Sequence, residues 1–199
     1  STNIHASCAI VAPALPIAQA GHASGKELLA ALLVGSEILC RLGMVTPVRM
    51  HEVGFHPTSV YGVFGGAYTV GRLRALDADQ LADAVGTAAS LSSGSIASFQ
   101  DGTSTKTMHV GFAASAAVRS VALAKAGISG PRQVFEGKFG WYRSHVQGAA
   151  DFNFNALTDA LGTRWEVLNI APKLYPVAYT LMPFIEATLA LREQYEIDP

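Results

Sequence analysis

A histidine in a loop of glycine and proline is the residue whose type and setting best suit proton transfer. It is His56, in the segment Gly54-Phe55-His56-Pro57-Thr58. Loops held by a rigid scaffold carry many catalytic side chains, and imidazole titrates near neutral pH. His56 is therefore a candidate general acid or base. The alternative is a histidine that only caps the next helix or bonds a backbone carbonyl.

A lysine follows a run of hydroxyl side chains where a helix is expected to begin. The run is Thr103-Ser104-Thr105, and it leads into Lys106 and His109. Backbone amides and the helix dipole favour anions at a helix N-terminus, and Lys106 adds a full positive charge, so a carboxylate would dock there. His109 lies one turn further on, on the same face. The alternatives are a solvated lysine and a packed helix histidine.

Two further histidines are weaker candidates. His5 precedes the first expected helix, and on residue type alone a histidine so placed has no assigned role. His51 lies near His56 and is either a pocket wall or an exposed loop residue. No His-x-x-x-His pair or carboxylate pair accompanies these histidines, so we predict no metal site. No glycine motif follows an expected strand, so nucleotide binding is unsupported, and we predict no cofactor.

Long helices must position these residues. Apolar spacing and start signals predict them at residues 6–20, 24–42, 60–76, 77–90 and 107–126. Ser24 and Glu27 have the spacing of a capping box, and residues 77–80 form a second cap. The helix at 60–76 is rich in glycine, which costs helix stability but permits close backbone approach. We therefore expect it deep in a helical bundle, between polar loops at 44–58 and 90–105.

The pattern changes after Asn153. Residues 165–170, with an extension to 175, have the pattern of a strand, and residues 180–194 that of a helix. We therefore expect a mostly α fold with two parts: a partial helical domain over residues 1–150, and the first strand and helix of a small, incomplete α+β domain over residues 151–199. Because a sheet needs several strands, we expect the second part to be truncated or completed from outside the chain.

The bulk composition limits the kinds of partner. Half of the 199 residues are hydrophobic and 15% are charged, against about 25% in a typical soluble domain. We therefore expect much of the surface to be covered by missing segments or a partner subunit. The net charge of −1 and the scattered lysines and arginines disfavour nucleic acid. Apolar runs at 8–20 and 28–35 are shorter than the roughly 20 residues that span a bilayer, so no membrane contact is expected.

The cysteines and the first residues bear on the compartment. Cys8 and Cys40 are far apart and belong to no Cys-x-x-Cys motif, which fits a reducing compartment and argues against a disulfide framework or an iron–sulfur cluster. The opening residues have no signal-peptide pattern. The sequence therefore predicts a cytoplasmic protein.

Many of these motifs occur in an order that resembles the MmgE/PrpD family, over nearly the whole chain. The matching residues are His5 to Ala14, Ser24-Gly25-Lys26-Glu27, Arg41-Leu42-Gly43, Gly54 to Thr58, Gly65-Gly66-Ala67, Lys106-x-x-His109-x-Gly111, Gly130-Pro131, Phe135-Glu136-Gly137, Lys173-x-Tyr175-Pro176 and Ile185-Glu186-Ala187.

The resemblance implies a mostly helical large domain, a smaller α+β domain and a homodimer. It also implies a small polycarboxylate substrate, because family members act on citrate-like di- and tricarboxylic acids without metal or iron–sulfur help, as dehydratases, a decarboxylase and an epimerase. By the same resemblance, His56, Lys106 and His5 are the expected catalytic residues. We expect His51 and His109 to bind substrate.

Two departures from the family pattern keep alternatives open. Met182 stands where the family usually has a histidine, and it can neither titrate nor carry charge. An acidic, hydroxyl-bearing segment that usually precedes the match to His5 lies outside this chain. We expect a cofactor-independent lyase, either a dehydratase or a decarboxylase. The alternatives are an epimerase or isomerase of the same family, and a non-catalytic, truncated member that acts as a scaffold.

Overall fold

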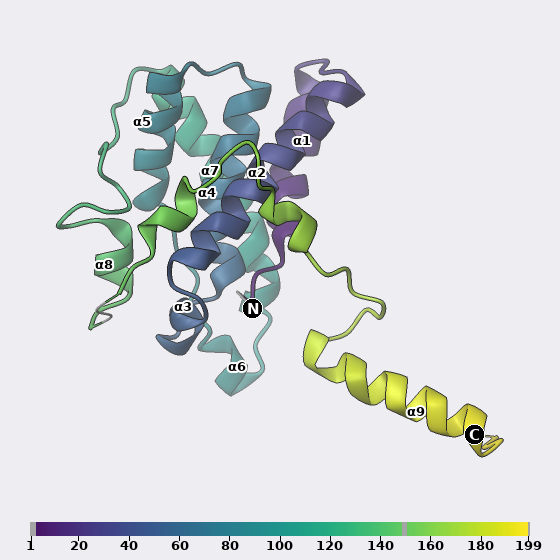
Figure 1. The fold of residues 1–199 in the computed structure, drawn as a ribbon. Coiled ribbons are helices and arrows are strands. Elements are labelled where there is room, and N and C mark those ends of the chain that lie inside the picture. Colours follow the sequence, from purple (N-terminus) through teal and green to yellow (C-terminus); the bar gives the residue numbers. More distant parts are fainter. Residues whose placement is uncertain (1–2, 149–150, 199) are drawn as a thin grey trace. The chain divides into compact units, whose positions relative to one another are not determined.

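The computed structural model describes residues 3–148 and 151–198, and the regular elements in this part of the chain are helices. Five long helices run side by side (Figure 1). They are α1 (Ala6–Ala20), α2 (Gly25–Val45), α4 (Pro57–Leu73), α5 (Ala78–Ala89) and α7 (Thr105–Lys125). The shorter helices α3 (Arg49–Glu52), α6 (Ser98–Asp101) and α8 (Trp141–His145) lie in connecting segments. The mostly α fold is therefore confirmed.

The start signals in the sequence act as expected. Ser24 and Glu27 form a reciprocal capping box before α2, and Asp77 and Gln80 form one before α5. Each box satisfies backbone N–H groups that a helix leaves without partners. Gly21 ends α1, which contains two prolines but is not divided by them. The local sequence therefore fixes the boundaries of these helices closely.

Helix α4 is the central helix of the bundle, because it packs against α1, α2, α5 and α7. Fourteen of its seventeen residues are buried. A Cβ atom at Gly62 would lie 2.8 Å from the Cβ of Ala9 on α1, and one at Gly66 would lie 2.7 Å from the Cβ of Ala117 on α7. The glycines therefore allow close helix contact, as expected. The helix begins at Pro57 rather than residue 60, because proline is well suited to the first helical position.

Helix α2 is longer than its apolar run suggested. By length and composition alone it is long and apolar enough to cross a membrane, which corrects the expectation drawn from shorter runs. It packs against α1 and α4, however, and it carries a buried ion pair between Glu37 and Arg41. These features are those of a core helix.

Helix α8 was not expected from the sequence. Its Trp141 and Tyr142 pack against rings of α4: the Trp141 centroid lies 5.1 Å from that of Phe64, and the Tyr142 centroid 6.2 Å from that of Tyr61. The Tyr142 hydroxyl donates to the carbonyl of Leu42 at 2.6 Å. The short helix α8 thus packs against both α2 and α4, which are far from it in the sequence.

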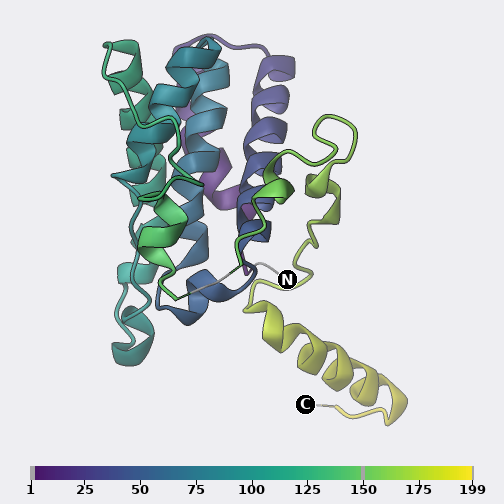
Figure 2. The ribbon, with the colours of Figure 1, turned by 60° about the vertical axis from the view of Figure 1, so that its left-hand side comes forward.

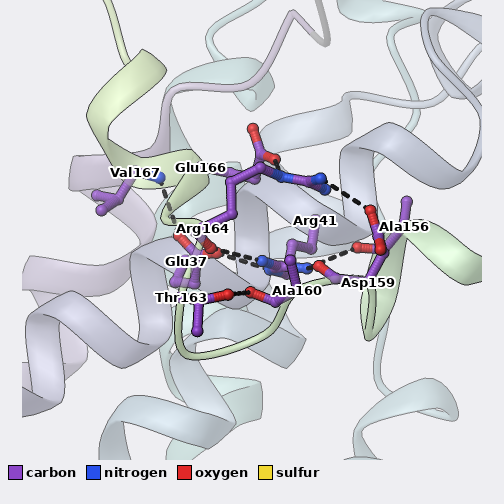
Figure 3. A network of polar contacts seen from close by, with 9 residues as sticks. All are labelled: Glu37, Arg41, Ala156, Asp159, Ala160, Thr163, Arg164, Glu166 and Val167. Atoms are coloured by element: carbon purple, nitrogen blue, oxygen red, sulfur yellow. Dashed lines mark hydrogen bonds and ion pairs between the residues drawn. The ribbon is translucent and has the colours of Figure 1, made fainter.

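The segment after Asn153 is attached to α2 through buried charge. Figure 3 shows Arg41 surrounded by carbonyl oxygens of this segment. The Arg41 guanidinium donates to the carbonyls of Ala156, Asp159 and Arg164 at 3.0, 2.9 and 2.8 Å. The first compact unit runs to Val167. The boundary between a helical and an α+β domain at residue 150 stays a prediction.

The strand expected at residues 165–170 is not confirmed. Glu166–Asn169 forms a 3-10 helix, and another spans Phe154–Leu157. The described residues contain only an isolated bridge between Phe55 and Ser95, and a strand is stable only beside another strand.

The second unit, residues 168–199, carries a 3-10 turn at Tyr179–Leu181 and helix α9 (Met182–Gln194), which appears in yellow in Figure 2. The helix expected at residues 180–194 is confirmed. Met182 is its first residue, and Pro183 follows at a position that suits proline. Within this unit the Tyr175 hydroxyl donates to Glu186 at 2.6 Å. That the unit opens an α+β domain stays a prediction.

Candidate active site

Three of the long helices bring their N-terminal ends together. The backbone N–H of His5, which precedes α1, donates to the Thr58 hydroxyl in the first turn of α4 at 3.0 Å. The Nδ1 atom of His56, at the start of α4, lies 3.1 Å from the Nδ1 atom of His109, near the start of α7. Because helix N-termini carry partial positive charge, their convergence favours an anion at this end of the bundle.

A backbone hydrogen bond fixes the position of His56, and its side chain takes no part in capping the helix. It is the N-cap residue of α4, but its side chain makes no capping hydrogen bond. Its backbone N–H donates to the carbonyl of Gly94 at 2.8 Å. The residue is 6% exposed, and its ring contacts His109. Within the described residues, the His56 side chain therefore makes neither the capping hydrogen bond nor the bond to a backbone carbonyl that the alternative needs, while its catalytic role stays a prediction.

The loop at residues 90–97 packs against the start of α4 and is hydrogen-bonded to it. The N–H of Ile96 donates to the carbonyl of Gly54 at 2.9 Å, and Ser59 donates to the carbonyl of Ser93 at 2.6 Å. Gly94 has a φ of +137°, and a Cβ there would lie 2.7 Å from the Ser59 side chain. This loop was missed as part of the site, because a glycine in a polar loop gives no signal of what packs against it.

His109 is buried, with 4% of its surface exposed, in the second turn of α7. Its ring centroid lies 5.3 Å from that of His56, and the two planes are inclined by 40°. His109 is therefore packed within the fold, as one expectation had it, and it also lies beside the candidate site residue His56, as the other requires. Its side chain contacts the candidate base directly.

Lys106 and His51 share an aromatic neighbour that sequence reasoning missed. The Lys106 Nζ atom lies 4.5 Å above the centre of the Phe99 ring, and the His51 ring centroid lies 6.4 Å from that of Phe99. Phe99 belongs to α6, in a segment expected to be a loop. Among residues 3–148 and 151–198, Lys106 makes no ion pair or hydrogen bond, so its ammonium group is available to an anion.

The electrostatics of the site are those of an anion-binding corner. Burial, and then the neighbouring His109, Lys106, His5 and His51 in that order of importance, lower the pKa of His56 from 6.5 to about 4. Burial and then Lys106 also lower the pKa of His109. The four groups whose charge acts on His56 are thus all basic, and together with His56 they are the five residues singled out from the sequence. His56 is therefore neutral at pH 7, and a carboxylate bound beside it would raise its pKa toward the range of an efficient base.

Metal binding has no visible site within the described chain. No group of three or more histidine, cysteine, aspartate or glutamate residues there is arranged to hold an ion. The expectation of a metal-free site stays a prediction.

Comparison with known proteins agrees with the fold and with the order of motifs. Residues 1–154 match the MmgE/PrpD N-terminal domain. The chain is 29% identical to the cis-aconitate decarboxylase-like protein oryM of Aspergillus oryzae, over 95% of this chain and 42% of that protein. It is 28% identical to a cis-aconitate decarboxylase of Aspergillus terreus, over 86% of this chain and 36% of that protein. The chain therefore spans less than half the length of these curated relatives.

Proposed function

Since the chain belongs to the MmgE/PrpD family, we propose that the protein is a cofactor-independent lyase acting on a citrate-like di- or tricarboxylic acid. Within that class we propose a decarboxylase before a dehydratase, because the two relatives described above are named for cis-aconitate decarboxylase. The proposed site is the corner formed by the N-terminal ends of α1, α4 and α7.

The observation that carries this proposal is the gathering of basic side chains and helix N-termini at that corner. Three helix N-termini meet there, Lys106 has no anionic partner in the described chain, and the charges that act on His56 are basic. Such a site favours an anion. A substrate with two or three carboxylates would supply the missing negative charge, and Lys106 would hold one carboxylate.

His56 is the proposed proton-transfer group. Dehydration needs removal of a proton from the carbon next to a carboxylate, after which the hydroxyl leaves as water. Decarboxylation leaves the electron pair of the broken carbon–carbon bond on the substrate as CO2 departs, and that carbon then takes up a proton. In both reactions Lys106 would balance the developing negative charge, and His56 would accept or return the proton. His5 would assist at the rim of the site.

An epimerase or isomerase is the second candidate, and Met182 is the observation that favours it. A methionine where the family usually has a histidine removes one titratable group. Epimerisation needs removal and return of a proton without a departing group, so it makes fewer demands on the site. A non-catalytic scaffold is the remaining alternative.

Proton NMR in D2O of the full-length protein with 2-methylcitrate, citrate, cis-aconitate and iminodisuccinate separates these possibilities. Loss of cis-aconitate with new vinyl signals supports the decarboxylase. Consumption of 2-methylcitrate or citrate with new alkene signals indicates a dehydratase. Deuterium exchange beside a carboxylate without loss of substrate supports the epimerase. A folded protein that changes none of these acids would contradict the enzymatic proposal and favour the scaffold.

A further inference from the structure

The contact between His56 and His109 restricts where protons can lie. Their Nδ1 atoms are 3.1 Å apart, which is hydrogen-bonding distance, and both rings are buried. A neutral imidazole has one N–H donor and one acceptor nitrogen. One ring must therefore carry its proton on Nδ1 and the other must carry it on Nε2. Two arrangements satisfy the contact, and they differ in what remains on the Nε2 atom of His56.

Only one of these arrangements leaves His56 able to act as a base. If His56 donates through Nδ1, its Nε2 atom keeps a free lone pair. When that lone pair takes a proton, the Nδ1–H donor stays in place, so the bond to His109 continues and stabilises the positive charge. If His109 donates instead, Nε2 of His56 already holds the proton. Because hydrogen bonding fixes the tautomer of a histidine, the His109 ring determines which nitrogen of His56 carries the proton.

We propose that His109 is a positioning residue that accepts the Nδ1 proton of His56 and thereby keeps Nε2 of His56 as the atom that takes up a proton, from the substrate or from solvent, and returns it to the substrate. This inference rests on the proposed function and deepens it, since it assigns the control of the base to a residue on another helix. His109 was expected from the sequence to bind substrate, and the geometry gives it a different task.

The surroundings keep His109 in the state that this role needs. An acceptor ring must be neutral, because a protonated His109 would carry a donor on both nitrogens and would repel the Nδ1–H of His56. Burial and the Lys106 ammonium, one turn before His109 on α7, oppose that protonation. His5 and His51 act on His56 in the same sense from the segment before α1 and from α3. Burial of the pair and the neighbouring Lys106 ammonium therefore favour one proton per ring.

Histidine tautomers are measured directly by NMR of the full-length protein labelled with nitrogen-15 at histidine. At pH 7 we expect an unprotonated Nε2 and a protonated Nδ1 for His56, and the reverse for His109. The signals are assigned with the single variants His56→Asn and His109→Asn. His22→Asn, in the exposed turn between α1 and α2, serves as the matched control and should remove only its own signals. The reversed tautomers, or Nε2–H on both rings, would overturn the inference.

A pair of variants adds a kinetic readout. His109→Asn keeps an acceptor oxygen close to the position of Nδ1, whereas His109→Leu keeps only volume. We expect the leucine variant to lose about 100-fold in kcat with a smaller change in KM, and the asparagine variant to recover most of that loss. Equal activity of the two variants would overturn the role. If the protein is inactive on every acid tested, the proposed function fails, but the tautomer measurement still decides this inference.

Discussion

Glu37 and Arg41 lie one turn apart on α2 and form an ion pair of 2.6 Å with side chains that are 3% and 0% exposed. The second carboxylate oxygen of Glu37 accepts the backbone N–H of Val167 at 2.9 Å (Figure 3). Burial of charge is costly unless each charged group is paired and hydrogen-bonded. Here the pair meets that condition by binding the backbone of residues 156–167, so one turn of α2 holds the end of the first unit.

Replacing Arg41 with Met should destabilise the protein by about 3–5 kcal/mol, because it leaves the Glu37 carboxylate buried without its partner. Urea unfolding measures the loss, and hydrogen exchange at the Val167 amide should accelerate. The control is Arg49→Met, which breaks the exposed Arg49–Glu52 pair and should cost less than about 1 kcal/mol. Similar losses from both variants would contradict a special role for the buried pair.

Two glycines on helices offer a test of close packing. Gly66→Ala should destabilise, because its Cβ would lie 2.7 Å from that of Ala117, and even a small excess of core volume costs about 1–3 kcal/mol. Gly111→Ala on α7 meets nothing within 4 Å and should stabilise by up to about 1 kcal/mol through helix propensity. Thermal unfolding of both variants measures the two effects separately: the change in melting temperature of Gly111→Ala reports helix propensity, and that of Gly66→Ala reports packing. A stabilising Gly66→Ala would show that α4 and α7 pack less closely.

The parts of the fold that depend on local sequence were predicted well. Capping boxes at Ser24 and Asp77 mark helix starts because the bonds involved lie within one turn. The glycine-rich helix was expected to be central, because glycine in a helix is favoured only where another backbone comes close. The strand at residues 165–170 was not confirmed, since a strand depends on a distant partner that local pattern cannot reveal.

The site was predicted by residue type, and its geometry was not. Lys106 and His56 were selected for their chemistry and their place near helix starts. The Nδ1 contact between His56 and His109 depends on how α4 and α7 pack, and the support from Gly94 depends on a loop folding back onto Gly54. Phe99 gave no signal, because one aromatic residue in a polar segment has no periodic pattern. The geometry of the site therefore depends on contacts between residues far apart in the sequence, which residue spacing cannot predict.

Lys106 should be needed for turnover and not for folding. Lys106→Met removes the ammonium group and keeps much of the side-chain volume, so kcat/KM should fall by about 100-fold or more through loss of charge stabilisation. Lys125→Met, at the other end of α7, is the matched control and should keep full activity. Steady-state kinetics with the active acid compares them, and circular dichroism checks the fold. An active, folded Lys106→Met protein would remove Lys106 from the mechanism.

His56 should make the protein sensitive to acid in a defined window. Its pKa is lowered from 6.5 to about 4 in the folded state. Between these values the unfolded chain binds more protons, so stability is fully present above pH 6.5 and is lost as pH falls toward 4. The stability lost between pH 7 and pH 4.5 through this one group is on the order of 2 kcal/mol. His56→Asn should therefore lose less stability than the parent protein between pH 7 and 4.5 in urea unfolding. Equal losses would show that His56 is not held neutral.

A bound polycarboxylate should raise the pKa of His56. The ring is now surrounded by basic groups, and a carboxylate placed among them favours the protonated ring, by about one pKa unit or more. The probe is tricarballylate, a tricarboxylate that has neither a hydroxyl nor a double bond to react. An NMR titration of the His56 ring with and without tricarballylate measures the shift, and the neutral triamide of the same acid is the control. Lys106→Met should weaken tricarballylate binding, because it removes the ammonium group that would hold a carboxylate. If calorimetry shows tricarballylate bound while the pKa of His56 stays the same, the anion lies elsewhere, and the corner formed by α1, α4 and α7 is not the substrate site.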